Sequence, residues 1–331
     1  MSSTNRADTG RSQARCAPRV LHLHDEAAMA GRCGDDPLLA TRLARPADPP
    51  GLVANLDREL LFPPARGRLH CNQPCAAMPR LHAASNASLD CRLTPWDERV
   101  FGVPCAEITG LDGHDDETQI LALLQQFDTW ARENGVRFAY ARVAPEAAAK
   151  RAFHRAGFYF AEASYRVGHR HIQGSAVFDR LIRRGPVLEP AVVADHAALQ
   201  QILADDFEHG RIHEDPWVTR EQAALRYRNW LHDLIEQGHE LLCYRLKGEV
   251  IGLHVQRADE GRVDLVLTGV KRSHALLGAS LWAEVLRLNR LRGVREAHTL
   301  ISAANIPILN LYRRLDFQFD ALLVGFHKRY E

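Results

Sequence analysis

The chain lacks the long apolar runs that mark a membrane protein. None of its hydrophobic stretches reaches the ~20 residues that a membrane-spanning helix needs, and its N-terminus has no signal-peptide core. An excess of charge of either sign is also missing, since 42 Lys and Arg oppose 41 Asp and Glu. We therefore expect no membrane partner, and the charge balance implies no nucleic-acid partner.

Paired cysteine motifs are scarce as well. The seven cysteines are odd in number and scattered, which favours a reducing cytoplasm over a disulfide framework. Cys71 and Cys75, near His70 and His82, have partial zinc-ligand spacing, but a structural zinc site needs a second pair of that quality. We expect no metal and free thiols in a polar segment, with a zinc-binding regulator as the alternative.

The chain is long enough for about two domains, and its parts differ in composition. Residues 1–86 are rich in Arg, Ala, Pro, Asp and Gly, which is typical of a segment of low order. Residues 87–175 and 186–331 alternate between strand and helix patterns. The sequence thus predicts an N-terminal extension followed by two folded units of mixed α/β structure.

The clearest pattern lies near the C-terminus. Residues 297–302 are typical of a buried strand, residues 307–315 of an amphipathic helix, and the segment from Phe317 of a final strand. Asn305 precedes the helix at a position where it can cap it, and Tyr312 lies within the helix.

The first unit ends in a shorter version of the same order. A strand, a short helix and Gly157-Phe158 precede another strand, but Glu146 and Phe153 stand where the second unit has Asn305 and Tyr312. We therefore predict that the first unit is a degenerate copy of the second and serves as a packing lobe without an active site of its own.

The stretch from His298 to Phe319 resembles the C-terminal part of the GNAT acetyltransferases, whose pattern is a strand followed by N-x-x-A-x-x-L-Y-x-x-x-G-F. Ile308 departs from the small residue of that pattern and Asp316 from its glycine. The resemblance implies tandem GNAT-like lobes, the first one incomplete, and acetyl-CoA as the acyl donor. The residues at the positions of the pattern are Asn305, Ile308, Leu311, Tyr312, Asp316 and Phe317.

The resemblance also implies a place for the donor. A loop that runs into a helix N-terminus supplies N–H donors for a pyrophosphate. Residues 271–280 lie where the family has this loop, with Leu276 in place of its first glycine, and a structural helix entry is the alternative. The implied cofactor-binding residues are Leu267, Thr268, Val270, Ser273, Leu277, Gly278, Ala279 and Asn305.

Three residues are candidates for proton transfer. Tyr312 is predicted to protonate the leaving thiolate, with a core tyrosine as the alternative. Asp264 and His298 lie on adjacent predicted strands and are candidates for taking the proton of the amine, directly or through water. Each of these two is equally well explained by a structural role.

Two further segments resemble the N-acetyltransferases of nucleotide-linked 4-amino-6-deoxyhexoses. One is the Trp-Asp-x-x-x-Phe-Gly opening at Trp96, and the other spans residues 208–230, where Gly210 and Ile212 depart from the family pattern. Arginine suits a diphosphate and a carboxylate suits an amine. A turn before a helix and a buried tryptophan are the alternatives. The implied substrate-binding residues are Arg211, His213, Asp215, Tyr227 and Trp230.

The sequence therefore predicts a cytoplasmic N-acetyltransferase. It would move an acetyl group from acetyl-CoA to the primary amine of a small acceptor, an amino sugar or a nucleotide-linked amino sugar, by direct attack. We expect it to act as a monomer or homodimer. A non-catalytic acyl-CoA-binding or assembly module is the alternative, and the sparse glycines of residues 271–280 favour it.

Overall fold

The computed structural model describes residues 80–82, 87–112 and 116–331. Most of the expected extension, residues 1–86, and the candidate zinc ligands Cys71 and Cys75 lie outside the described residues. Within that extension, Arg80–His82 form a short strand that pairs with the strand beginning at Ser88.

The described residues form eleven strands and seven α-helices, which confirms the mixed α/β fold. A 3₁₀-helix, Arg272–Leu277, leads into the α-helix Gly278–Leu291. The strands are β1 (Arg80–His82), β2 (Ser88–Leu93), β3 (Cys105–Asp112), β4 (Phe138–Val143), β5 (Tyr159–His169), β6 (Val187–Pro190), β7 (Glu240–Leu246), β8 (Glu249–Asp259), β9 (Arg262–Val270), β10 (Glu296–Ser302) and β11 (Gln318–Arg329). The helices are α2 (Pro95–Phe101), α3 (Glu117–Glu133), α4 (Ala147–Arg155), α5 (His196–Asp206), α6 (Arg220–Glu236), α7 (Gly278–Leu291) and α8 (Ile306–Arg314).

All eleven strands belong to one sheet, in the order β1-β2-β3-β4-β11-β5-β10-β9-β8-β7-β6. Only β3 with β4 and β9 with β10 pair in parallel among the described strands. Each parallel pair is followed by a helix and a strand, α4 and β5 after the first pair, α8 and β11 after the second. Residues 87–175 and 186–331, which we call the first and second halves, thus repeat one order of elements.

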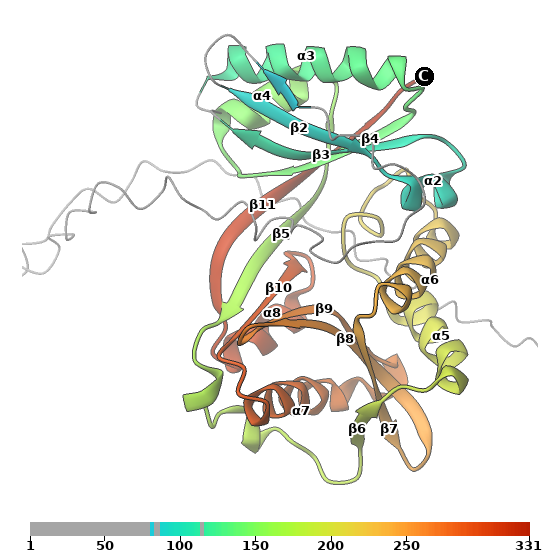
Figure 1. Cartoon of the computed structure of the whole chain (residues 1–331), viewed down its shortest axis with the longest axis vertical. Coiled ribbons are helices and arrows are strands. Elements are labelled where there is room, and N and C mark those ends of the chain that lie inside the picture. The colour runs from blue at the N-terminus through green and yellow to red at the C-terminus, as the bar shows by residue number, and fades with distance from the viewer. Residues whose placement is uncertain (1–79, 83–86, 113–115) are drawn as a thin grey trace, which may run out of the picture. The chain divides into compact units, whose positions relative to one another are not determined.

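The last strand of each half is inserted into the other half (Figure 1). β11 lies between β4 and β5 of the first half, and β5 lies between β10 and β11 of the second half. The two strands therefore pair with each other at the middle of the sheet. This exchange makes one continuous sheet of the two halves.

The repeat extends to individual side chains. Arg92 on β2 pairs with Glu107 on β3, and Arg257 on β8 pairs with Asp264 on β9, each with a nitrogen–oxygen distance of 2.5 Å. In both cases the partners stand directly opposite each other in the register, on the antiparallel pair that precedes the parallel pair. An ion pair at the same place in both halves points to a role in the sheet itself.

Helices cover both faces of the second half. Along β8, the ring centroid of His254 lies 6.3 Å from that of Trp282 on α7. Leu253 and Val255, which alternate with His254, pack instead in a cluster with Leu199 of α5 and others of α5 and α6. We call the face beneath α7 and α8 the α7 face and the opposite one the α5 face.

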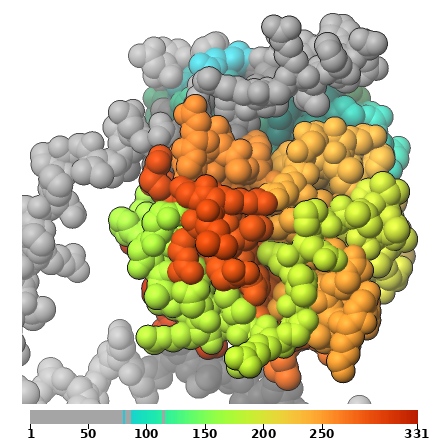
Figure 2. Space-filling model, turned by 60° about the horizontal axis from the view of Figure 1, so that its bottom comes forward, coloured from blue at the N-terminus to red at the C-terminus, as the bar shows by residue number. Residues whose placement is uncertain are grey.

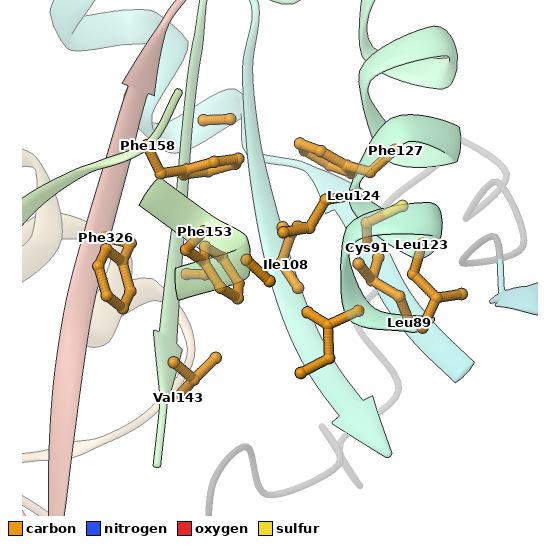
Figure 3. Packing of buried hydrophobic residues seen from close by; sticks show 14 of the residues in the cluster. Leu89, Cys91, Ile108, Leu123, Leu124, Phe127, Val143, Phe153, Phe158 and Phe326 are labelled. Atoms are coloured by element: carbon orange, nitrogen blue, oxygen red, sulfur yellow. The ribbon is translucent and has the colours of Figure 1, made fainter. Parts of the chain in front are cut away.

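The core of the first half depends on the end of the chain. Phe153 of α4 stacks on Phe326 of β11 with ring centroids 5.0 Å apart, and both belong to the cluster beneath α3 and α4 (Figure 3). Phe326 is 5% exposed, so the first half buries a side chain that the sequence places in the second.

The connector between the halves lies against the second half. Asp179 of this connector, residues 176–185, pairs with Arg290 of α7 at 2.7 Å, and just before it the Gln173 side-chain amide donates to the Val294 carbonyl oxygen at 2.7 Å. Figure 2 shows this connector in light green, beside the orange segments of the second half. Within the part of the chain that the structure describes, we find no helix with the length and apolar character needed to span a membrane.

Candidate active site

The site begins where β9 and β10 part. Their parallel ladder has three pairs, the last of which joins Asp264 and His298. Beyond it β9 stays paired with β8 and β10 with β5, so the facing edges of β9 and β10 carry backbone groups outside any ladder between them. Just past the last pair, the Thr299 hydroxyl donates to the Leu265 carbonyl oxygen at 2.8 Å. We call this place the divergence of β9 and β10.

Tyr312 lies at the divergence. Its side chain is 1% exposed and packs against Trp282 and Phe317, with ring centroids 5.1 and 4.7 Å away. Burial raises the pKa of the Tyr312 phenol well above its usual value, and a hydrogen bond with Thr299 opposes that shift. The phenol therefore keeps its proton at neutral pH, and the residue is at once part of the core and in contact with the divergence.

Asn305 caps α8. Its side-chain oxygen accepts from the Ile308 amide at 3.3 Å, which confirms the predicted capping role. In the first half, Glu146 holds the corresponding position before α4 and makes no side-chain cap. The helix that carries Tyr312 thus begins with a side-chain cap, and the corresponding helix of the first half does not.

The predicted cofactor loop is a 3₁₀-helix. Within it the Gly278 amide donates to the Ala275 carbonyl, so this donor has a partner inside the protein. Lys271 pairs with Glu249 at 2.7 Å and Arg272 pairs with Glu208, both on the surface. The loop carries positive charge, but its backbone N–H groups are less available to a ligand than those of a glycine-rich loop would be.

The other predicted cofactor residues lie in three environments. Leu267 is buried against α5 and α6, and the Thr268 hydroxyl lies 2.7 Å from the Nδ1 atom of His254. Ser273 is exposed and its hydroxyl lies 3.0 Å from the Nδ1 atom of His274. Those packed at the start of α7 or against its cluster are Val270, Leu277 and Ala279.

Asp264 and His298 are brought together, but on the face opposite Tyr312. Val263 and Leu265, which flank Asp264, pack in the cluster of α7 and Tyr312, so Asp264 points to the α5 face. The same alternation places His298 there. The Arg257 ion pair favours a structural role for Asp264, because Glu107 has the same pair in the half that lacks the tyrosine.

His298 is 7% exposed and has polar neighbours. Its Nε2 atom lies 3.2 Å from a Glu296 carboxylate oxygen and 3.4 Å from an Arg262 nitrogen. These contacts orient the ring at the last pair of the ladder. The structure is thus compatible with either role predicted for this residue.

Residues 207–219, which we call the acceptor segment, cross the divergence on the α5 face. Phe207 lies so close to Gly269 of β9 that a side chain at Gly269 would collide with it. Glu214 accepts a hydrogen bond from the hydroxyl of Ser302, at the end of β10. The acceptor segment therefore spans the two strands that part.

The acceptor segment continues to the first half. Asp215 is 2% exposed, and its Oδ2 atom lies 2.6 Å from Nδ1 of His327 and accepts from the Tyr159 hydroxyl at 2.8 Å. Burial raises the pKa of Asp215, but hydrogen bonds from His327 and the Trp217 amide outweigh it, so the pKa lies below its usual value. Asp215 thus has protein partners, and the contact with an amine expected from the sequence stays a prediction.

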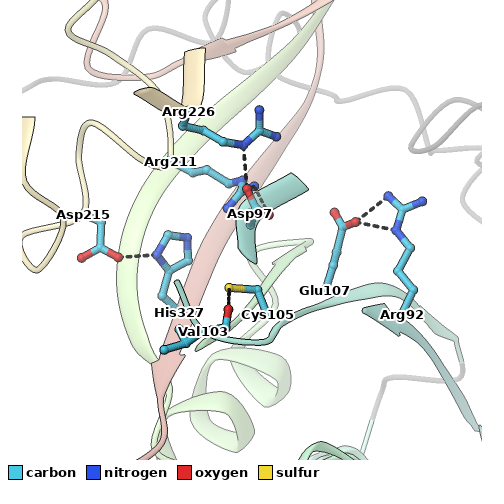
Figure 4. A network of polar contacts seen from close by, with 9 residues as sticks. All are labelled: Arg92, Asp97, Val103, Cys105, Glu107, Arg211, Asp215, Arg226 and His327. Carbon is cyan, nitrogen blue, oxygen red and sulfur yellow. Dashed lines mark hydrogen bonds and ion pairs between the residues drawn. The ribbon is translucent and has the colours of Figure 1, made fainter. Parts of the chain in front are cut away.

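Arg211 is also held by the protein. Its guanidinium lies 3.6 Å from the Tyr140 ring centroid and 3.2 Å from Asp97, which also accepts from Arg226 at 2.6 Å (Figure 4). Burial raises the pKa of Asp97, but the two arginines outweigh it and hold the pKa below its usual range. Arg211 therefore anchors the acceptor segment to α2, and the diphosphate contact expected for it stays a prediction.

The remaining predicted substrate residues form an aromatic group. Ring centroids of His213 and Tyr227 lie 4.6 Å apart, and those of Tyr227 and Trp230 lie 5.7 Å apart. Burial lowers the pKa of His213 to about 4, so its ring is neutral at pH 7. Trp230 is half-buried and packs against the α5 and α6 cluster, which is compatible with either role predicted for it.

Sequence reasoning missed several residues of this site. Glu214 and Ser302 are hydrogen-bonded although 88 residues separate them in the chain. His327 reaches Asp215 only because β11 is inserted in the first half, and no local pattern marks it. Asp97 belongs to the Trp-Asp motif. That motif indicated that Asp97 is important, but it did not indicate which residues contact it.

Among residues 80–82, 87–112 and 116–331 no group of three or more His, Cys, Asp and Glu side chains is arranged to hold a metal ion. Of the seven cysteines, the structure describes Cys91, Cys105 and Cys243, whose side chains are buried.

No protein-family model matches the sequence, and no curated protein matches it. In structure the chain is similar to a GCN5-related N-acetyltransferase from Sphaerobacter thermophilus, at 15% identity over 73% of this chain and 76% of that one, with a TM-score of 0.51. It is also similar to a conserved protein of unknown function from Staphylococcus epidermidis, at 12% identity over 77% and 95% of the chains, with a TM-score of 0.54.

A third similar structure is the GCN5-related glucosamine N-acetyltransferase region of a fungal multi-domain GH3 β-N-acetylglucosaminidase. The identity is 13%, the similarity covers 72% of this chain and 31% of that chain, and the TM-score is 0.53. At these identities the comparisons establish the fold. The chain has the fold of the GCN5-related N-acetyltransferases.

Proposed function

We propose that the protein transfers an acetyl group from acetyl-CoA to the primary amine of a small acceptor. The observation that carries the proposal is Tyr312, a neutral phenol with its hydroxyl partner at the divergence of β9 and β10. The fold, shared with GCN5-related N-acetyltransferases, supports the same donor. The first half, which has Phe153 in place of this tyrosine, serves as a packing lobe.

The divergence suits a thioester. Facing strand edges offer N–H and C=O groups to the amide-rich arm of acetyl-CoA, and the start of α7 with Lys271 and Arg272 offers positive charge to its phosphates. Leu267, Thr268 and Val270 line β9 past the last ladder pair, and Asn305 lies at the start of α8. These residues are the proposed donor site.

The reaction joins the two faces of the sheet. The amine attacks the thioester carbonyl from the α5 face, a C–N bond forms, and the C–S bond breaks. Tyr312 gives its proton to the departing thiolate, and the proton of the amine passes to His298, Glu214 or water on the α5 face. His298 and Glu214 both adjoin β10 on this face.

The acceptor is proposed to be an amino sugar or a nucleotide-linked amino sugar. Support comes from the resemblance of residues 208–230 to the nucleotide-sugar N-acetyltransferases and from the position of this segment across the divergence. His213, Tyr227 and Trp230 would supply the aromatic wall against which a sugar packs. We further propose a cytoplasmic monomer or homodimer with no nucleic-acid or membrane partner.

One observation favours a second function. The Gly278 amide, which would face a pyrophosphate, already donates to Ala275. The sparse glycines of residues 271–280 favour a non-catalytic acyl-CoA-binding or assembly module as the second candidate. This second candidate predicts binding of acyl-CoA without turnover.

Calorimetric titration of the full chain with acetyl-CoA and with free CoA tests the donor site, and an amine panel with a thiol-release assay then tests transfer. Micromolar binding and amine-dependent thiol release are expected. Binding without release for any amine would support the second candidate, and absence of binding for both nucleotides would contradict both functions.

A further inference from the structure

Arg166 is a buried cation without a carboxylate partner. It lies on β5 and is 9% exposed, and its side chain makes no hydrogen bond or ion pair within the part of the chain that the structure describes. Burial lowers the pKa of its guanidinium, and Asp320 opposes that shift from a distance. Asp320 itself is bonded by Arg170 at 2.7 Å, so it is already paired.

Other arginines of the central strands and the acceptor segment are paired. Arg142 bonds Glu162 at 2.6 Å, and Arg211 bonds Asp97 at 3.2 Å. None of the Arg166 nitrogen atoms is fully shielded from solvent, so the guanidinium, which no protein oxygen bonds in the described part of the chain, is open to an anion that can offer it two oxygen atoms. Arg166 departs from the pairing of its neighbours, and its environment fits an anionic ligand.

The position of Arg166 relates it to the acceptor side of the site. Its register partner on β10 is Leu300, which lies two residues past the last ladder pair of β9 and β10 and is 39% exposed. Ser164 and Ser302 form the next pair on the same face, and Ser302 contacts the acceptor segment through Glu214. Arg166 therefore lies on the α5 face, one strand beyond β10.

We propose that Arg166 binds an anionic group of the acceptor, a carboxylate or a phosphate, while the amine of that acceptor lies at the divergence. Neighbouring strands are about 4.8 Å apart, so the amine and the anionic group would be roughly 5–10 Å from each other. A guanidinium matches the paired oxygen atoms of either anion. This inference rests on the proposed transferase for the place of the amine, but the anion site can be measured by itself.

The test compares matched amines by calorimetry on the full chain. Glucosamine 6-phosphate is paired with glucosamine, and 4-aminobutyrate with 4-aminobutanamide. In at least one of the two pairs, we expect the charged compound to bind at least about tenfold more tightly than its neutral partner. This factor corresponds to about 1.4 kcal/mol of binding free energy. The phosphate and carboxylate arms distinguish the two sources of negative charge.

Two variants test whether Arg166 causes the preference for the charged compound. R166M should remove it and R166K should keep part of it, while R151M should leave it unchanged because Arg151 is exposed and bonded to Glu117. Equal binding of the charged and neutral members of both pairs, including no binding of any, overturns the proposal. So does a preference that survives in R166M.

The thiol-release assay separates this result from that of the proposed function. An anion preference without release of thiol would retain the Arg166 site and contradict the transferase. Release of thiol without an anion preference would retain the transferase and contradict the Arg166 site. Circular dichroism of each variant reports whether it folds.

Discussion

Asp215 and His327 are joined by a buried hydrogen bond of 2.6 Å, although 112 residues separate them in the chain. The bond ties the acceptor segment to the last strand of the protein. The ring of His327 is buried among Phe138, Tyr140 and Tyr159. The position of the acceptor segment thus depends on residues of the first half, which has no tyrosine at the site of Tyr312.

Replacement of His327 should therefore weaken acceptor binding more than chemistry. In H327L, Asp215 keeps its Tyr159 and Trp217 partners but loses the imidazole, which costs about 1–3 kcal/mol for a buried polar group. We expect a raised KM for the amine with a smaller change in kcat and in the acetyl-CoA Kd. A kcat that falls while KM stays constant would contradict this positioning role.

Substitution of Tyr312 by Phe tests the general acid. We expect kcat to fall by about 10²–10⁴ while the acetyl-CoA Kd changes little, because the phenol acts on the leaving group. Tyr244→Phe is the matched control, since Tyr244 is also fully buried and donates its hydroxyl to Ser280 at 2.9 Å. Equal turnover in Y312F and Y244F would remove the role assigned to Tyr312.

Substitution of Asp264 by Asn distinguishes the two roles predicted for that residue. The pair with Arg257 is more than one-third exposed, so its loss should change the free energy of unfolding by less than about 1 kcal/mol. We expect kcat to stay within about twofold of the wild type. E107Q is the control in the first half, and a large loss of kcat in D264N alone would restore Asp264 as the base.

His254 makes stability depend on pH. Burial lowers the pKa of His254 to about 4, although its hydrogen bond with Gln256 opposes this shift. The unfolded chain takes up the proton below its ordinary pKa of about 6.5, whereas the folded protein does not. This contribution to stability is therefore complete above pH 6.5 and is lost as the pH falls toward 4.

Urea denaturation of the wild type and H254Q at pH 7 and pH 4.5 measures this effect. Between these two pH values, the wild type should lose about 2 kcal/mol more free energy of unfolding than the variant, because only the wild type has this titrating group. Equal losses in both proteins would contradict a neutral, buried His254. The circular dichroism of both proteins at pH 7 checks that they start from the same fold.

Much of the local structure could be predicted, because it depends on neighbours in the sequence. The strand expected at residues 297–302 is Glu296–Ser302, and the helix expected at residues 307–315 is Ile306–Arg314. Asn305 caps that helix as its position indicated. Periodicity and capping chemistry are local properties, so the sequence carries them directly.

The partners of Arg211 and Asp215 could not be predicted in the same way. Each contact joins segments that only the exchange of strands between the halves brings together. Asp97, for example, precedes Arg211 by 114 residues. The type of each residue indicated a charged contact, but whether that contact is to a ligand or to the protein depends on which strands are neighbours. No spacing in the sequence encodes that order of strands.

The insertion of β11 between β4 and β5 has a consequence for the synthesis of the protein. While the ribosome is still making the second half, β4 and β5 lack the strand that separates them, and Phe153 lacks the ring of Phe326. Contacts between such distant residues form slowly, and the open strand edges are prone to wrong pairing. The first half, although it is translated earlier, is therefore completed only after β11 emerges.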